Sequence, residues 1–181
     1  NEYLDDLKSD ENAVQARFSL STFDSNSFSR RCVAVPMADV PHLSTDTFQP
    51  GARTPLLDAI ARVIRETEDQ VASSVDPDVV ITILTDGYEN ASQAYSIEEL
   101  SLLIRTKEAG GGTFAYLGAN QDAWEVASAM SIRRGNSASF TSTPDGVINA
   151  MRSVSLATQA RYANRDRTSD RFLTEVTDER S

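Results

Sequence analysis

The sequence contains one cysteine and one histidine in 181 residues. Cys32 lies in a predicted strand, where we interpret it as a small buried apolar residue. It cannot form a disulfide within the chain, so the redox compartment is not revealed. His42 lies in a predicted loop. One histidine and one cysteine exclude a zinc site and a Cys/His dyad built from this chain alone.

Long apolar runs are also missing, because none approaches membrane-spanning length, and no secretory signal peptide is visible. Positive charge is scarce: 17 Lys and Arg face 27 Asp and Glu, for a formal net charge of -10. This balance argues against nucleic acid or an anionic membrane as a partner, because both select a basic surface. It is compatible with divalent cations or basic partners, and we expect a soluble, cytoplasmic protein.

Helical and strand patterns alternate along the chain. In chain order we expect a helix over 1–9, a hairpin of strands 17–24 and 31–37, a helix from 55, a strand over 79–84, a helix over 96–110, a strand over 112–118, a helix from 122, a strand over 137–141 and a helix to about 162. This order predicts an α/β domain over 1–162, with a mainly parallel central sheet between helices. The charged tail, 163–181, is expected to be frayed.

The glycines of "AGGGT", at 109–113, do not form a phosphate-binding loop. Such a loop follows a strand and opens a helix, whereas these glycines end a helix and lead into a strand. Ser96 and Glu99 have the spacing of a capping box at the start of that helix. The run 79–84 is apolar and rich in β-branched residues, which is typical of a parallel strand covered on both faces.

The chemistry-bearing residues lie at the end of that strand, in "ITILTDGYEN". Functional sites of open parallel sheets gather beyond the carboxyl ends of the strands, where Asp86 is expected. Thr54 precedes a helix that can pack beside it. A hydroxyl, a carboxylate and waters form an all-oxygen site, which suits magnesium. Two alternatives stay open: Thr54 caps its helix, and Asp86-Gly87 is only a turn.

Together, "GARTPLLDAI" and "ITILTDGYEN" resemble the von Willebrand factor A domain, the fold of integrin I domains. The resemblance covers nearly all of residues 1–160. It implies a three-layer, Rossmann-like fold with helices on both faces of a sheet that has one antiparallel edge strand. It also implies a metal-ion-dependent adhesion site in which Thr54 and Asp86 bind Mg²⁺, or Mn²⁺ or Ca²⁺, and an Asp or Glu of a protein partner completes the coordination. We expect the partner to be contacted by Arg53, Gly87, Tyr88, Glu89 and Asn90.

One motif of the family is absent. The Asp-x-Ser-x-Ser sequence of its first metal loop does not occur in the first half of this chain, and "DSNSFS", at 24–29, falls in the hairpin turn, which we expect at the wrong end of the sheet. The family's central first strand is missing as well. A sheet without it would leave backbone groups unpaired. We therefore favour an incomplete sequence, or completion by a separate segment, over a self-sufficient fold.

The leading functional hypothesis is a protein-binding module, by resemblance an intracellular bacterial or phage adaptor or assembly factor, in some cases beside an AAA+ ATPase. A second hypothesis is a scaffold subunit whose site has lost its metal. An enzyme is disfavoured. Phosphoryl transfer from Asp86 would want a second carboxylate two residues on and a fixed lysine, but position 88 is Tyr. The single histidine, in an early loop, argues against a Ser-His-Asp set.

Overall fold

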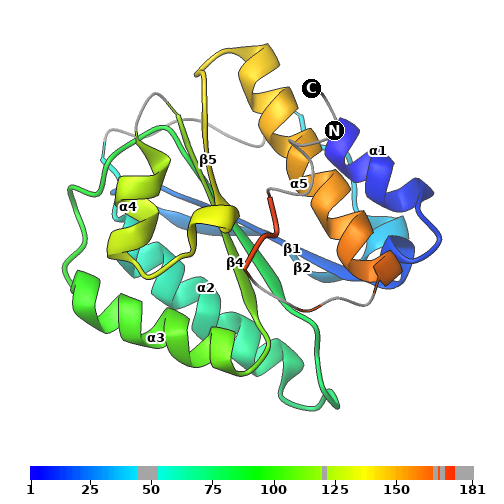
Figure 1. Cartoon of the computed structure of the whole chain (residues 1–181), viewed down its shortest axis with the longest axis horizontal. Coiled ribbons are helices and arrows are strands. Elements are labelled where there is room, and N and C mark those ends of the chain that lie inside the picture. The colour runs from blue at the N-terminus through cyan, green and yellow to red at the C-terminus, as the bar shows by residue number, and fades with distance from the viewer. Residues whose placement is uncertain (45–52, 120–121, 165–166, 168–169, 174–181) are drawn as a thin grey trace.

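Helices and strands alternate through most of the computed structural model, which describes residues 1–44, 53–119, 122–164, 167 and 170–173 (Figure 1). The helices are α1 (Glu2–Ser9), α2 (Leu56–Val71), α3 (Ile97–Ala109), α4 (Ala123–Ala129) and α5 (Pro144–Asn164). The strands are β1 (Arg17–Phe23), β2 (Phe28–Pro36), β3 (Val80–Thr85), β4 (Thr113–Ala119) and β5 (Ser137–Phe140). The predicted α/β class is confirmed, and the arrangement is consistent with a Rossmann-like fold.

The strands form two sheets. β3, β4 and β5 are parallel neighbours in that order, and β1 and β2 form a separate antiparallel hairpin. The sequence predicted one mainly parallel sheet with one antiparallel edge strand, whereas the described residues form two sheets, and no described strand joins β1 to β3. In Figure 1 the hairpin runs behind β4 and β5.

The predicted helix boundaries are set by local hydrogen bonds. Ser96 and Glu99 form the expected capping box at the start of α3. The Asp122 side chain accepts the N–H groups of residues 124 and 125 at the start of α4. At the end of α3, Gly111 has a φ of 90°, a conformation that glycine adopts without strain. The helix-stop interpretation of these glycines is confirmed.

Helices cover both faces of the parallel sheet. The side chains of β4 alternate between these two faces. Phe114 and Tyr116 pack with α2, α3 and α4, whereas Ala115 and Leu117 pack with α5. A third cluster lies between α1 and the hairpin and contains Cys32, which is buried as expected. Tyr3 of α1 contacts both the second and the third cluster, so α1 links the hairpin to α5.

The strand β3 is less buried than its apolar sequence predicts. All seven residues of β4 are buried, but in β3 only Ile83 and Thr85 are, and Leu84 is 39% exposed. The expectation that the strand over 79–84 is covered on both faces is thus met only in part, whereas β4 is buried throughout. The physical reason is that β3 has a described neighbour on one edge only.

Part of the charged tail packs on the domain. Phe172 and Leu173 are buried against α5 and β4. The Phe172 N–H donates to Asn136 Oδ1 at 2.8 Å, and the Leu173 N–H donates to the Gly135 carbonyl at 2.8 Å. The prediction of a frayed tail is wrong at these two residues; residues 174–181 lie outside the described part.

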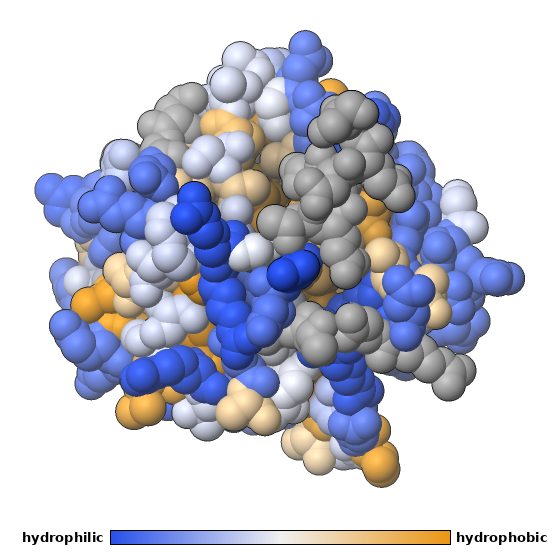
Figure 2. Space-filling view, viewed as in Figure 1, coloured by the Kyte–Doolittle hydropathy of each residue, from blue (hydrophilic) through white to orange (hydrophobic). Residues whose placement is uncertain are grey.

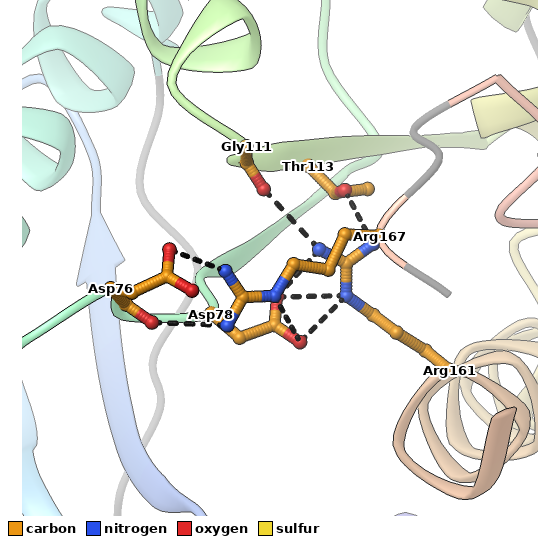
Figure 3. Close-up of polar contacts among 6 residues, drawn as sticks. All are labelled: Asp76, Asp78, Gly111, Thr113, Arg161 and Arg167. Atoms are coloured by element: carbon orange, nitrogen blue, oxygen red, sulfur yellow. Dashed lines mark hydrogen bonds and ion pairs between the residues drawn. The ribbon is translucent and has the colours of Figure 1, made fainter. Parts of the chain in front are cut away.

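A buried arginine ties α5 to the amino ends of β3 and β4 (Figure 3). Arg161 is 4% exposed and donates to both carboxylate oxygens of Asp78 at 2.5–3.2 Å. It also donates to Thr113 Oγ1 at 2.9 Å and to the Gly111 carbonyl at 3.3 Å. Arg167 binds the neighbouring Asp76 at 2.7 Å. Planar, multidentate pairing of this kind is specific to arginine.

We predict that Arg161→Met lowers the free energy of unfolding by about 3 kcal/mol, because the carboxylate of Asp78 loses its principal partner at a mostly buried position. Urea denaturation measures the change. The control is Arg152→Met, on the same helix, whose exposed ion pair with Glu2 at 3.3 Å should contribute less than about 1 kcal/mol. Equal effects of the two substitutions would contradict the structural role of Arg161.

Candidate functional site

Thr54 and Asp86 are brought to the same edge of the parallel sheet. Thr54 lies just before α2, and Asp86 directly follows β3. The Thr54 side chain packs against Gly87: a Cβ added to this glycine would overlap Thr54 Oγ1 and lie 3.4 Å from Thr54 Cβ. The hydroxyl therefore occupies space that only a glycine leaves open, immediately beside the residue that bears the carboxylate.

Asp86 is exposed, and its carboxylate makes no hydrogen bond or ion pair to any residue that the structure describes. This distinguishes it from Asp58 and Glu89, whose carboxylates bind backbone N–H groups. Thr85, just before it, is buried, and its hydroxyl donates to the Gly87 carbonyl at 3.0 Å and accepts the Gly87 N–H at 3.2 Å. Two hydrogen bonds between Thr85 and Gly87 thus close the turn, and the Asp86 carboxylate between them is exposed at the end of β3.

Asn90 joins the two loops. Its Oδ1 accepts the Thr54 N–H at 2.9 Å, and its own N–H donates to the Thr54 carbonyl at 3.2 Å. These reciprocal bonds fix the Thr54 backbone relative to the loop after β3. The Asn90 side-chain oxygen is therefore used within the chain.

Glu89 performs the capping that the sequence suggested for Thr54. The helix α2 begins after Pro55 without a side-chain cap from the preceding residue, so the capping interpretation of Thr54 is wrong. Instead, Glu89 accepts the Leu57 N–H at 3.0 Å and Ser92 Oγ accepts the Asp58 N–H at 3.2 Å. Residues from a loop more than thirty positions away thus satisfy the free N–H groups at the start of α2.

The Glu89 carboxylate is also bound inside its own loop. It accepts the N–H groups of Ala91 at 2.9 Å and Ser92 at 2.7 Å, and the Ser92 hydroxyl at 2.7 Å. Partial burial alone would raise the pKa of Glu89, but the hydrogen bonds from Ser92, Leu57 and Ala91 offset it and hold the pKa below its ordinary value.

Asp58 makes the matching contact from α2. Its carboxylate accepts the N–H groups of Gln93, Ala94 and Tyr95 at 2.8–3.2 Å. Asp58 therefore holds the far half of the loop against the first turn of α2. Sequence reasoning missed this role, as it missed that of Glu89, because no local pattern links an acid in the first turn of a helix to a distant loop.

The hairpin turn lies at the same edge as this site. The Ser25 N–H donates to the Arg53 carbonyl at 3.0 Å. The expectation that the turn lies at the wrong end of the sheet is therefore wrong. Asp24 Oδ1 accepts the N–H groups of Asn26 and Ser27, which makes it a turn former and lowers its pKa.

Arg53 and Tyr88 are exposed residues of the two loops that meet at this edge. Arg53 is exposed, and Tyr88 is 58% exposed. Glu89 and Asn90 bind within the chain, and Gly87 supplies space for Thr54. A partner-binding role for these five residues stays a prediction.

The donor set at this edge is small. The described residues contain no group of three or more His, Cys, Asp or Glu side chains that could hold a metal ion. The site offers one carboxylate and one hydroxyl. This number of protein ligands fits magnesium, which keeps several waters, better than calcium, which takes six to eight oxygen ligands.

A pocket of about 260 Å³ lies at the opposite, amino end of the strands. It opens between α2, α3 and the start of β3, and its walls include Ile64, Val71, Val79 and Phe114, with the ion pair of Glu68 and Lys107 among its lining. It shares no residue with the site at Asp86.

Hydrophilic residues dominate the face shown in Figure 2, with small apolar patches between them.

Comparisons with protein-family models, with curated protein sequences and with solved structures gave no match. In the described part of the chain, no helix has the length and apolar character needed to cross a membrane.

We predict that Gly87→Ala destabilises the chain by about 1–3 kcal/mol, because the new methyl group displaces Thr54. Urea denaturation measures the loss. In a double-mutant cycle, Thr54→Ala removes the overlapping hydroxyl, so the double variant should be more stable than the sum of the single effects. Additive effects would show that Thr54 does not pack against Gly87 in solution.

We predict that Glu89→Gln destabilises the chain by about 1–3 kcal/mol at neutral pH, because one amide cannot replace a carboxylate that accepts four hydrogen bonds. Since folding lowers the Glu89 pKa, its contribution is fully present above the ordinary value of 4.5 and is lost as the pH falls through the lowered value. The difference between parent and variant should therefore shrink below about pH 4. Glu98→Gln, on the exposed first turn of α3, serves as the control; an equal effect there would refute the prediction.

Proposed function

We propose that this chain is a protein-binding module of the von Willebrand factor A type, which captures an acidic side chain of a partner through a divalent cation. The observation that carries the proposal is the contact of the Thr54 hydroxyl with Gly87, next to the unpaired carboxylate of Asp86 at the carboxyl end of β3. Two motifs that are distant in the sequence thus meet where the resemblance requires them to meet.

Magnesium fits the residues at this edge. Thr54 Oγ1 and the Asp86 carboxylate would hold it, with waters in the remaining positions. The cation would supply a hard Lewis acid that attracts a carboxylate of the partner. The chain's own residues do the positioning: Asn90 fixes the Thr54 backbone, and Glu89 and Asp58 hold the loop that carries Asp86. Arg53 and Tyr88 would contact the partner around the cation.

The proposed setting is the cytoplasm, as an adaptor or assembly factor that binds a protein offering an Asp or Glu, with an AAA+ ATPase as one such partner. This part rests on the resemblance and on the acidic composition. The finer three-layer architecture of the family belongs to the same proposal, because the described residues form two sheets in place of one.

A second candidate function is a scaffold subunit that binds its partner without a metal. The observation that favours it is the small donor set: one free carboxylate and one hydroxyl, with no Asp-x-Ser-x-Ser loop in the first half of the chain. Partner binding that is unchanged by EDTA would select this function over the first.

We predict that Mn²⁺, used as a paramagnetic substitute for Mg²⁺, binds the chain and that Mg²⁺ competes with it. Electron paramagnetic resonance measures the free Mn²⁺. Asp86→Ala and Thr54→Val should each weaken binding by about tenfold or more, since each removes one protein ligand. Thr54→Ser keeps the hydroxyl and should retain most of the affinity.

The control for that titration is Asp69→Ala, which removes an exposed carboxylate from the far end of α2. It should leave Mn²⁺ binding unchanged. Equal affinity of the parent, Asp86→Ala and Thr54→Val would sink the proposed metal site, and it would leave the scaffold function as the better account.

A further inference from the structure

A groove beside the start of β5 is occupied by a segment of the chain's own tail. Residues 170–173, red in Figure 1, form a turn there. Of the described residues after α5, which are 167 and 170–173, only Phe172 and Leu173 are buried. Two buried anchors in an otherwise polar and charged segment are typical of a peptide that docks on a folded surface.

Gly135 leaves room for the tail backbone in this groove. A Cβ at position 135 would overlap the Asp170 carbonyl oxygen and lie 2.9 Å from Arg171 Cα. The apolar part of the groove is formed by β4 and α5, and it includes the short side chains of Ala115, Ala150 and Ala157. Glycine and alanine together therefore leave the volume that the tail segment fills.

Two acceptors in the groove select a peptide over other apolar molecules. Asn136 is fully buried, and its Oδ1 accepts the Phe172 N–H at 2.8 Å. The Gly135 carbonyl accepts the next N–H, that of Leu173, at 2.8 Å. A hydrocarbon in the groove would leave the first of these hydrogen bonds unmade at a buried position, which is costly. An occupant must therefore bring two successive backbone N–H donors together with its apolar side chains.

Arg133 adds a preference for an acidic residue. Its guanidinium binds the carboxylate of Asp170, two residues ahead of Phe172. Its Nε also lies 3.8 Å from Oε2 of Glu108, whose side chain is only 6% exposed. A buried carboxylate thus helps to hold the arginine beside the groove. Because Arg133 and Asp170 are largely exposed, their ion pair should orient the occupant more than it adds affinity.

We propose that this groove is a peptide-docking site for a protein partner, and that residues 170–173 compete with the partner for it. The partner segment has the same chemistry: an acidic residue, one further residue, an aromatic residue and a leucine, in a turn that presents two backbone N–H groups. The tail contact consists of two side chains, two backbone hydrogen bonds and one exposed ion pair. Since the ordering of the tail opposes this small contact, a partner with additional contacts can displace it.

The groove is separate from the site at Asp86. Gly135 and Asn136 directly precede β5, whereas Asp86 directly follows β3, so the two lie at opposite ends of the parallel strands. Docking in the groove therefore requires no metal, and it can be tested without one.

The test uses a fluorescently labelled synthetic peptide with the sequence TSDRFLTE, that of residues 168–175. Its binding to the full chain is measured by fluorescence anisotropy in EDTA. The parent chain should bind the peptide weakly, because its own tail competes at a high effective concentration. The double variant Phe172→Ser/Leu173→Ser should bind it at least about tenfold more tightly, since its tail no longer competes.

Two controls show whether the peptide binds in this groove. In the double variant, Gly135→Ala should abolish binding, because the new methyl group takes the place of the peptide backbone. Gly110→Ala should leave binding unchanged, since its Cβ would lie 3.4 Å from the nearest atom, the Lys107 carbonyl oxygen. A peptide N-methylated at its Phe and Leu keeps both side chains but lacks the two N–H donors, and it should not bind.

A second variant decides the matter if circular dichroism shows that the double variant does not fold. Asp170→Lys keeps both apolar residues and places a second positive charge beside Arg133. It should weaken the tail contact and raise the affinity for the peptide about threefold over that of the parent.

The proposal is overturned if neither variant binds the peptide more tightly than the parent does, because the tail is then a fixed part of the fold. Equal binding of the N-methylated peptide also overturns it. If the parent dimerises with rising concentration and a folded double variant does not, the occupant is the tail of a second copy, and the proposal of a separate partner fails.

Discussion

The candidate site depends on the way the loop after β3 is bound to the first turn of α2. Glu89 and Ser92 accept N–H groups of the helix start, and Asp58 of the helix accepts N–H groups of the loop. Each side therefore supplies the acceptors that the other side lacks, which leaves few backbone donors of either segment unsatisfied. Asp86 takes no part in this network, and its carboxylate is exposed.

The two ends of the parallel sheet differ in how their charged side chains are paired. At the amino end, the charges of Arg161 and Asp78 neutralise each other in a buried, multidentate ion pair. At the carboxyl end, acidic side chains accept hydrogen bonds from backbone N–H groups, and one carboxylate, that of Asp86, remains exposed. Buried ionic pairs fix a fold, whereas an unpaired, exposed carboxylate can still bind a cation.

The sequence predicted those features that short segments determine. The capping box of Ser96, the cap of Asp122 and the glycine stop after α3 follow from residues within one turn of each other. The sequence predicted that Thr54 and Asp86 lie close together, and the structure packs Thr54 against Gly87, the residue after Asp86. The roles of Glu89 and Asp58 could not be predicted, because their partners are backbone groups more than thirty residues away. The burial of Phe172 and Leu173 could not be predicted either, because they lie in a charged run and their partners are distant in the sequence.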